Sequence, residues 1–172
     1  MSESQLEQIL AQQRDTGIID VDEPMIKLVI FRLAEQYFAF VGSAIKEILP
    51  GTETVFFVPG MPSSVEGVIN VRGDIESVIQ LHSLLQLPYT LEKNSLSSSS
   101  LLLAHGQQIQ SALRVDQLLD VVDVMASLVQ PIPEAFPEHL QAYVSGLLEL
   151  NGLVVALLNI DAVLYAWQQG QG

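Results

Sequence analysis

A divergent twofold repeat limits the folds open to this chain more than any other feature of its sequence. A shift of 79 residues places Gly73 on Gly152 together with the apolar residues on either side. A second shift, of 73 residues, places 45–48 on 118–121. The two shifts agree if the second copy contains a longer loop. The sequence therefore predicts two similar units that share a core within one chain of 172 residues.

A hairpin with a glycine turn lies at the centre of each copy. In the first copy, residues 66–71 and 75–79 are strand-forming runs that flank Arg72, Gly73 and Asp74. In the second copy, Asn151-Gly152 interrupts a similar apolar stretch. Glycine takes a positive φ at little steric cost, and a two-residue hairpin turn needs one. Both stretches therefore predict β-hairpins.

The rest of the chain favours short strands and short helices without a βαβ rhythm. We expect hairpins across Ala34-Glu35 and His105-Gly106, with short helices at 81–87 and 161–168. This pattern predicts a mainly β protein made of two small barrels. The predicted units are listed here: a tail with a short helix at 1–24, a domain at 25–168, a first barrel at roughly 35–90, a serine-rich linker at 91–100 and a second barrel at roughly 101–168.

The composition excludes several classes of function. The chain has 7 basic and 20 acidic residues, a net charge of −13, which argues against a nucleic-acid partner. No apolar run is long enough for a membrane helix, so we expect no direct membrane insertion. There is no cysteine to form a disulfide or a thiolate metal site. The expectation is a soluble cytoplasmic protein.

Signals for catalysis are weak. Three histidines lie far apart and none has a metal-ligand partner at helical spacing. Asp116, Asp120 and Asp123 could share a helical face and bind a cation, although a solvated acidic face explains them better. There is neither a phosphate-binding glycine loop nor a nucleophile elbow. We therefore expect no enzyme activity, no cofactor and no metal.

Arg72 and Glu47 are the two charged residues for which the sequence offers a specific role. Arg72 lies at the tip of a glycine turn in a chain with few cations, so it could bind an acidic partner. Pairing with a nearby carboxylate, Glu66, Asp74 or Glu76, is the simpler explanation. Glu47 flanks the apolar pair Ile45 and Ile48, where it could either recognise a partner or stand as an ordinary exposed charge.

A series of motifs, in order and spacing, resembles the CheW family. Asn70-Val71-Arg72-Gly73, a few residues after Gly67-Val68, is the most specific of them. The motifs that carry the resemblance are 45–48, Pro59-x-x-Pro62, 66–73 and 78–81, then 112–116, 120–121, Pro131, Pro133, 143–146 and 159–161. The resemblance extends from about residue 26 to residue 167.

The resemblance implies two intertwined, SH3-like, five-stranded β-barrels with a few short helices. It implies a non-catalytic adaptor, recruited to membrane-associated receptor arrays, that couples a CheA-type histidine kinase to the cytoplasmic tips of methyl-accepting chemoreceptors. One barrel would dock on the kinase's CheW-like regulatory domain, and a groove between the barrels would take the receptor tip. At matching positions Ile45, Glu47 and Arg72 would face the receptor. Asn70 would support the turn, and the kinase-facing residues stay unassigned.

Departures from the family pattern leave two alternatives open. Gln80 and His82 stand where the family usually has an aspartate and a basic residue, and Arg114 interrupts an apolar strand. A specialised paralogue serving type IV pilus motility or phototaxis is therefore one alternative. A regulator that binds a small molecule such as a purine is the other, although the chain lacks a phosphate loop.

Overall fold

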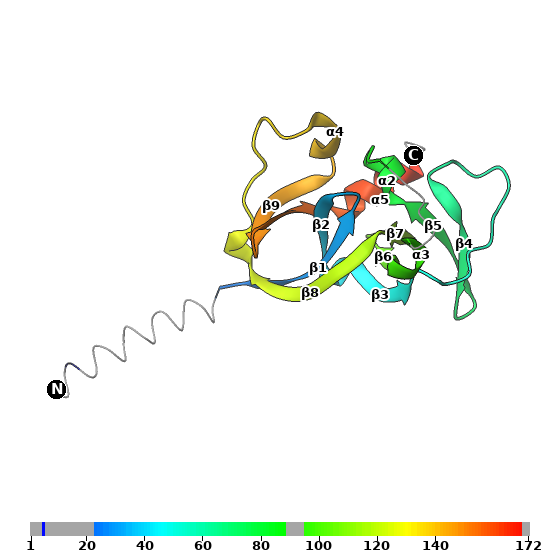
Figure 1. The fold of residues 1–172 in the computed structure, drawn as a ribbon, viewed down its shortest axis with the longest axis horizontal. Helices are drawn as coiled ribbons and strands as arrows, with labels where there is room; N and C mark the ends of the chain where they lie inside the picture. The colour runs from blue at the N-terminus through cyan, green and yellow to red at the C-terminus, as the bar shows by residue number, and fades with distance from the viewer. Residues whose placement is uncertain (1–4, 6–22, 89–94, 170–172) are drawn as a thin grey trace.

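The computed structural model describes residues 5, 23–88 and 95–169, and these form short strands with a few short helices (Figure 1). No helix in these ranges is both long and apolar enough to span a bilayer. The elements, in chain order, are β1 (Met25–Leu33), β2 (Gln36–Val41), η1 (Gly42–Ala44), β3 (Ile45–Pro50), β4 (Val65–Val71), β5 (Asp74–Gln80), α2 (Leu81–Leu84), α3 (Ser95–Ser98), β6 (Ser100–His105), β7 (Gln110–Val115), β8 (Gln117–Met125), η2 (Ala126–Leu128), α4 (Glu138–Gln141), β9 (Val144–Leu150), β10 (Leu153–Leu158) and α5 (Ile160–Gln168).

Ten strands form two five-stranded sheets, which confirms the mainly β fold expected from the sequence. The first sheet has the order β8-β1-β2-β10-β9, and the second has the order β3-β6-β7-β5-β4. Adding five to each strand number of the first sheet, and counting on from β10 to β1, gives the strand order of the second sheet. The two sheets are therefore related by the same twofold repeat that relates the two halves of the sequence.

The two sheets exchange strands between the sequence copies. The first sheet combines β1 and β2 with three strands of the second copy, and the parallel pair β2–β10 joins them. In the second sheet the parallel pair β5–β7 has the same role. The ranges 35–90 and 101–168, expected as two barrels, therefore mark the two copies and not the two sheets. Barrel boundaries drawn along the chain are wrong because parallel pairing joins strands that are distant in sequence.

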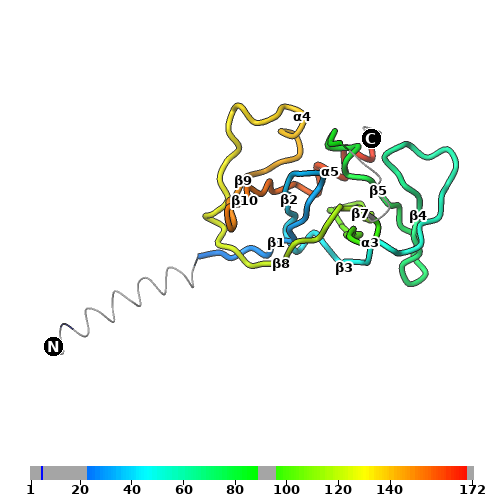
Figure 2. Tube along the Cα trace, in the orientation of Figure 1, coloured from blue at the N-terminus to red at the C-terminus, as the bar shows by residue number. Residues whose placement is uncertain are grey.

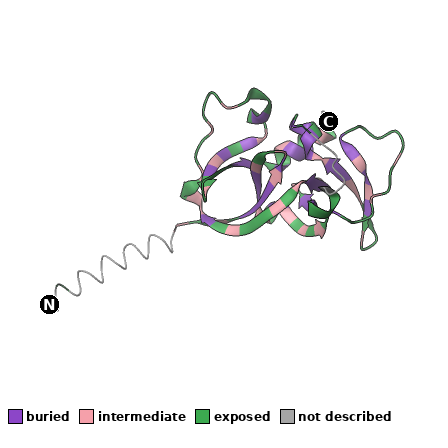
Figure 3. Cartoon of the chain, in the orientation of Figure 1, coloured by how far each residue is buried: buried purple, intermediate pink, exposed green. Residues whose placement is uncertain are grey.

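The largest core cluster lies between the sheets and is shared by them. Phe31, Phe38 and Phe40 come from the first sheet, and the ring centroids of Phe31 and Phe40 lie 5.4 Å apart. Leu102 and Leu113 come from the second sheet, while α2 and α5 close the cluster. Each sheet also has a smaller apolar cluster of its own. Buried residues accordingly concentrate where the sheets and α5 meet (Figure 3).

The loops that precede β4 and β9 lie toward opposite outer ends of the molecule (Figure 2). Each is tied to its sheet by one isolated bridge, Phe56 to Val68 in the first copy and Gln130 to Leu147 in the second. These bridges are also equivalent, since residues 68 and 147 differ by the repeat shift of 79. The loop before β9 carries α4 and is the longer one, as the two sequence shifts predict.

The serine-rich linker differs from its expectation. Residues 95–98 form α3, Ser99 is buried and Ser100 begins β6. The Ser99 hydroxyl donates to the carbonyl of Leu96 at 2.9 Å, and it accepts from Arg114 Nη1 at 2.9 Å. Residues 96–98 are exposed, but the second half of the expected linker forms α3 and the start of β6, and Ser99 is buried. Residues 91–94 lie outside the described residues. Most of the tail predicted at 1–24 also lies outside them.

Candidate docking site

The β4–β5 turn presents Arg72 at its tip. Arg72 and Gly73 have φ values of 51° and 92°, so both central residues are left-handed, as a type I′ hairpin turn requires. The Asn70 side-chain oxygen accepts a hydrogen bond from the Gly73 amide at 2.8 Å. Gly73 takes its positive φ without the steric cost that a Cβ would cause. The hydrogen bond from the Gly73 amide to the Asn70 side chain stabilises the turn. This geometry fixes the backbone beneath Arg72.

The Arg72 guanidinium forms a bidentate ion pair with Glu47 of β3. Nη1 donates to Glu47 Oε1 at 3.1 Å, and Nη2 donates to Oε2. The Arg72 side chain is 71% exposed and that of Glu47 is 27% exposed. The hydrogen bond and charge of Arg72 lower the pKa of Glu47 below its ordinary value of 4.5, and Glu47 raises the pKa of Arg72. Both groups are therefore charged at neutral pH.

Ile45 lies at the start of the strand that carries Glu47. The pairing register between β3 and β6 shifts between Ile45 and Glu47, which marks a β-bulge at Lys46. Ile45 is half-buried and packs against the core shared by the two sheets. The structure therefore brings Glu47 and Arg72 into direct contact, while Ile45 adds an apolar side chain two residues away on the same strand.

The second copy repeats this turn geometry without the ion pair. Asn151 and Gly152 have φ values of 51° and 80° and form the same kind of turn. Under the two repeat shifts, Arg72 corresponds to Asn151 and Glu47 corresponds to Asp120. The Asp120 carboxylate accepts a hydrogen bond from the amide of Val121 at 2.8 Å. Because Asn151 carries no charge, this turn cannot form an equivalent ion pair, so the candidate site distinguishes the first copy from the second.

The simpler explanation of Arg72, pairing with Glu66, Asp74 or Glu76, is wrong. Glu66 instead binds Arg114, and Glu76 accepts from the side-chain amide of Gln110 at 2.6 Å. Arg72 reaches across to β3 because the β4–β5 turn lies beside that edge strand. Pattern alone could not reveal this contact, since Glu47 and Arg72 are 25 residues apart.

Arg114 and Glu66 form a second ion pair, which none of the motifs in the sequence predicted. Arg114 is 3% exposed, and its Nε and Nη2 donate to the two Glu66 oxygens at 2.7 and 2.6 Å. Its Nη1 also donates to the carbonyl of Gly51 at 3.1 Å and to Ser99. An arginine within an apolar strand was the signal, because a buried cation needs a carboxylate partner. The pair joins β7, β4 and two loops.

Asp116 connects the two sheets. It follows β7 of the second sheet and precedes β8 of the first. Its Oδ2 accepts from the Ala34 amide at 2.7 Å and lies 3.0 Å from Nε2 of the buried His82. The alternative in which Asp116, Asp120 and Asp123 share a helical face is wrong, because Asp120 and Asp123 lie on strand β8.

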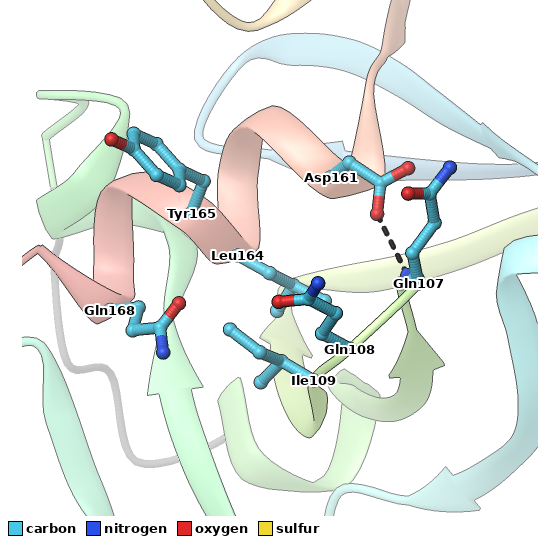
Figure 4. Close-up of a pocket in the computed structure, with 8 residues that line it drawn as sticks. Gln107, Gln108, Ile109, Asp161, Leu164, Tyr165 and Gln168 are labelled. Carbon is cyan, nitrogen blue, oxygen red and sulfur yellow. Dashed lines mark hydrogen bonds between the residues drawn. The ribbon is translucent and has the colours of Figure 1, made fainter.

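A hollow of about 340 Å³ lies between the β6–β7 turn and α5 (Figure 4). Gln107, Gln108 and Gln168 provide side-chain amides, and Leu164 and Ile109 provide apolar surface. Asp161 Oδ1 accepts a hydrogen bond from the backbone amide of Gln107 at 2.9 Å, as the dashed line in Figure 4 shows. Asp161 therefore serves to hold the β6–β7 turn against α5.

These features define a class of small, mainly β domain in which two strand-exchanged sheets present a charged hairpin turn. The family model described as CheW-like domain matches residues 27–167, and the chain belongs to that family. This confirms the family expected from the sequence motifs.

Curated relatives support the same assignment. A probable chemotaxis protein CheW from Rhizobium etli is 24% identical over 80% of this chain and 86% of its own length. Chemotaxis protein CheW from Treponema pallidum is 25% identical over 81% of this chain and 82% of its own length. Chemotaxis protein CheW from Helicobacter pylori is 22% identical over 94% of this chain and 96% of its own length.

The fold also matches a solved structure. The scaffolding protein TtCheW from Thermoanaerobacter tengcongensis aligns with a TM-score of 0.70 and 21% identity, covering 79% of this chain and 90% of its own. At that identity the similarity concerns the fold alone. It agrees with the two five-stranded barrels expected from the sequence.

Proposed function

We propose that this protein is a non-catalytic chemosensory adaptor, which couples a CheA-type histidine kinase to the cytoplasmic tips of methyl-accepting chemoreceptors. The family match over residues 27–167 is the observation that carries this proposal. The matches to the curated relatives named above cover 82–96% of their own length, and those relatives carry the names chemotaxis protein CheW or probable chemotaxis protein CheW. The adaptor would work in the cytoplasm, at receptor arrays on the membrane.

The Arg72–Glu47 pair is the proposed receptor-binding centre. A guanidinium has five donors, and two of those of Arg72 bind Glu47. The remaining donors are available to a carboxylate or carbonyl on the receptor, because the side chain is largely exposed. Ile45 would add an apolar contact, and Asn70 would keep the turn in place. Glu47 would orient the guanidinium before binding, which lowers the entropic cost of association.

The kinase would bind elsewhere, through its CheW-like regulatory domain. Exposed aromatic side chains on the loop before β4 are of the kind that such an interface uses, and Phe57 is 79% exposed there. A partner that covers this loop need not contact the turn that carries Arg72. Separate surfaces would allow one adaptor to hold both partners together.

A binding experiment with both partners tests this proposal. The full chain is titrated with a receptor-tip fragment and, separately, with the kinase regulatory domain, using calorimetry. Arg72→Ala should weaken receptor binding by about 1–3 kcal/mol, because a charged hydrogen-bonding group is lost. Arg72→Lys should lose less, and Arg72→Glu should lose more, especially at low salt.

Kinase binding and thermal stability provide the controls. All three Arg72 variants should bind the kinase domain like the unmodified chain, and Asn151→Ala at the equivalent turn should leave both affinities unchanged. The site assignment is wrong if Arg72→Ala keeps full receptor affinity. The adaptor proposal itself is wrong if the unmodified chain binds neither partner.

A further inference from the structure

We propose that this protein has a binding site for a small organic amine with an aromatic or aliphatic body. The site, called here the amine cavity, has a volume of about 390 Å³. It lies between the β1–β2 turn, strand β10 and the loop segment 136–140, which Figure 1 shows beside β9. This inference does not rest on the adaptor function, because the cavity shares no residue with the Arg72–Glu47 site.

The walls of the amine cavity are mainly apolar. Phe38 and Ala156 are buried members of the core shared by the two sheets, and they also line the cavity. Phe136 and Leu140 line it from the loop and pack against the same core cluster. The cavity is therefore a place where the shared core opens to solvent. Its volume and its lining are typical of small-molecule sites in proteins.

The wall formed by the loop is held in place by its own hydrogen bonds. The Phe136 amide donates to the carbonyl of Pro133 at 3.0 Å, and the Leu140 amide donates to that of Pro137 at 3.0 Å. The side-chain amide of Gln141 donates to the carbonyl of Phe136 at 2.8 Å. A cavity with a preformed wall needs little ordering when a ligand enters. This wall belongs to the loop before β9, which is longer than the equivalent loop before β4 in the first copy. The wall is therefore a feature of the second copy alone and not a consequence of the twofold repeat.

The charge around the amine cavity selects a cation. Among the described residues that line it, Glu35 is the only one with a formal charge. Residues 115–172, which supply eight of the twelve lining residues, contain seven acidic residues and no lysine or arginine. Arg32 is the cation nearest to Glu35 in the sequence; its Nη1 donates to the carbonyl of Ala34, and it does not line the cavity. An ammonium group is attracted by such a surface, and an anion is repelled. The aromatic rings of Tyr37 and Phe136 also favour a cation beside their faces.

Three probes of similar shape test this charge preference. The full chain, labelled with ¹⁵N, is titrated with 2-phenylethylamine, with neutral 2-phenylethanol and with anionic 3-phenylpropionate while amide shifts are recorded. We expect saturable shifts for the amine at Gly152, Val154 and Phe136. The alcohol should bind more weakly, and the carboxylate should produce no saturable shift. Equal affinities for the three probes, or no saturable shift with the amine at millimolar concentration, would overturn the proposal.

Matched variants locate the site. Glu35→Gln should weaken amine binding by about two- to fivefold, the range of an exposed ion pair, and leave the alcohol unaffected. Glu53→Gln makes the same change of charge on the loop before β4 and should have no effect. A Glu35→Gln variant that binds the amine as well as Glu53→Gln does would contradict the assignment.

A second pair of variants uses the repeat as its control. Val154 and Ile75 occupy equivalent positions in the two copies and are 60% and 64% exposed, so a lysine is tolerated at either. Val154→Lys places an ammonium at the amine cavity and should abolish binding of the amine probe. Ile75→Lys adds the same charge to the other sheet and should leave binding unchanged. Equal effects of the two variants would overturn the proposal.

Discussion

Replacing Arg114 by methionine should destabilise the protein more than any surface substitution. The change removes the bidentate pair with Glu66 and the bonds to Gly51 and Ser99. It leaves the Glu66 carboxylate without its cation in a position that is only 20% exposed. Breaking one side of a buried ion pair costs about 3–5 kcal/mol. For a chain of this size that corresponds to a fall in Tm of about 6–20 °C.

Urea unfolding followed by circular dichroism measures this loss. The double variant Arg114→Met, Glu66→Met removes both charges and should recover most of the stability, because well-packed apolar residues often replace a buried ion pair without loss. Arg32→Met is the matched control. Arg32 is only partly buried and bonds the carbonyl of Ala34, so its loss should cost about 1 kcal/mol or less. A loss below about 1 kcal/mol for Arg114→Met, or a double variant less stable than either single one, would refute this reasoning.

Three further predictions concern the turns, the serine segment and the docking site. Gly152→Val should lower the free energy of unfolding by about 1–3 kcal/mol, and Gly152→Asn should lower it much less. The cause is backbone strain, because the φ of 80° disfavours a β-branched residue, while no atom lies near the position of an added Cβ. Thermal unfolding of the two variants measures the difference. Ser99→Ala should lower the free energy of unfolding by about 1–3 kcal/mol, because it removes an acceptor for a hydrogen bond of the buried Arg114. Ser63 is exposed, so Ser63→Ala should change that free energy by no more than about 0.5 kcal/mol in the same urea assay. The pKa of Glu47, measured by carboxyl NMR, should lie below 4.5 and should rise in Arg72→Ala. The ion pair therefore contributes its full stabilisation of the fold above pH 4.5 and loses it as the pH falls through the lowered pKa. An unchanged pKa of Glu47 in the variant would contradict the pairing.

Short-range patterns in the sequence determined which segments form strands and turns. Gly73 and Gly152 allow the left-handed turns of both central hairpins, and alternating apolar residues around them specify which face each strand buries. The family motifs are also short segments at fixed spacing, so the amino-acid sequence is sufficient to identify the family. These signals are local, because backbone conformation and side-chain alternation are properties of a few neighbouring residues.

Tertiary structure decided which of these segments meet. Strand exchange pairs β2 with β10 and β5 with β7, although neither pair is adjacent in sequence. Arg72 binds Glu47 and not the acidic residues beside it, and Arg114 binds Glu66 across 48 residues. A charge finds its partner only after the sheets have formed, since many arrangements of the same strands satisfy the local pattern equally well. The elements and their turns were therefore encoded locally, while the ion pairs, the burial of Ser99 and the amine cavity followed from long-range packing of the two sheets.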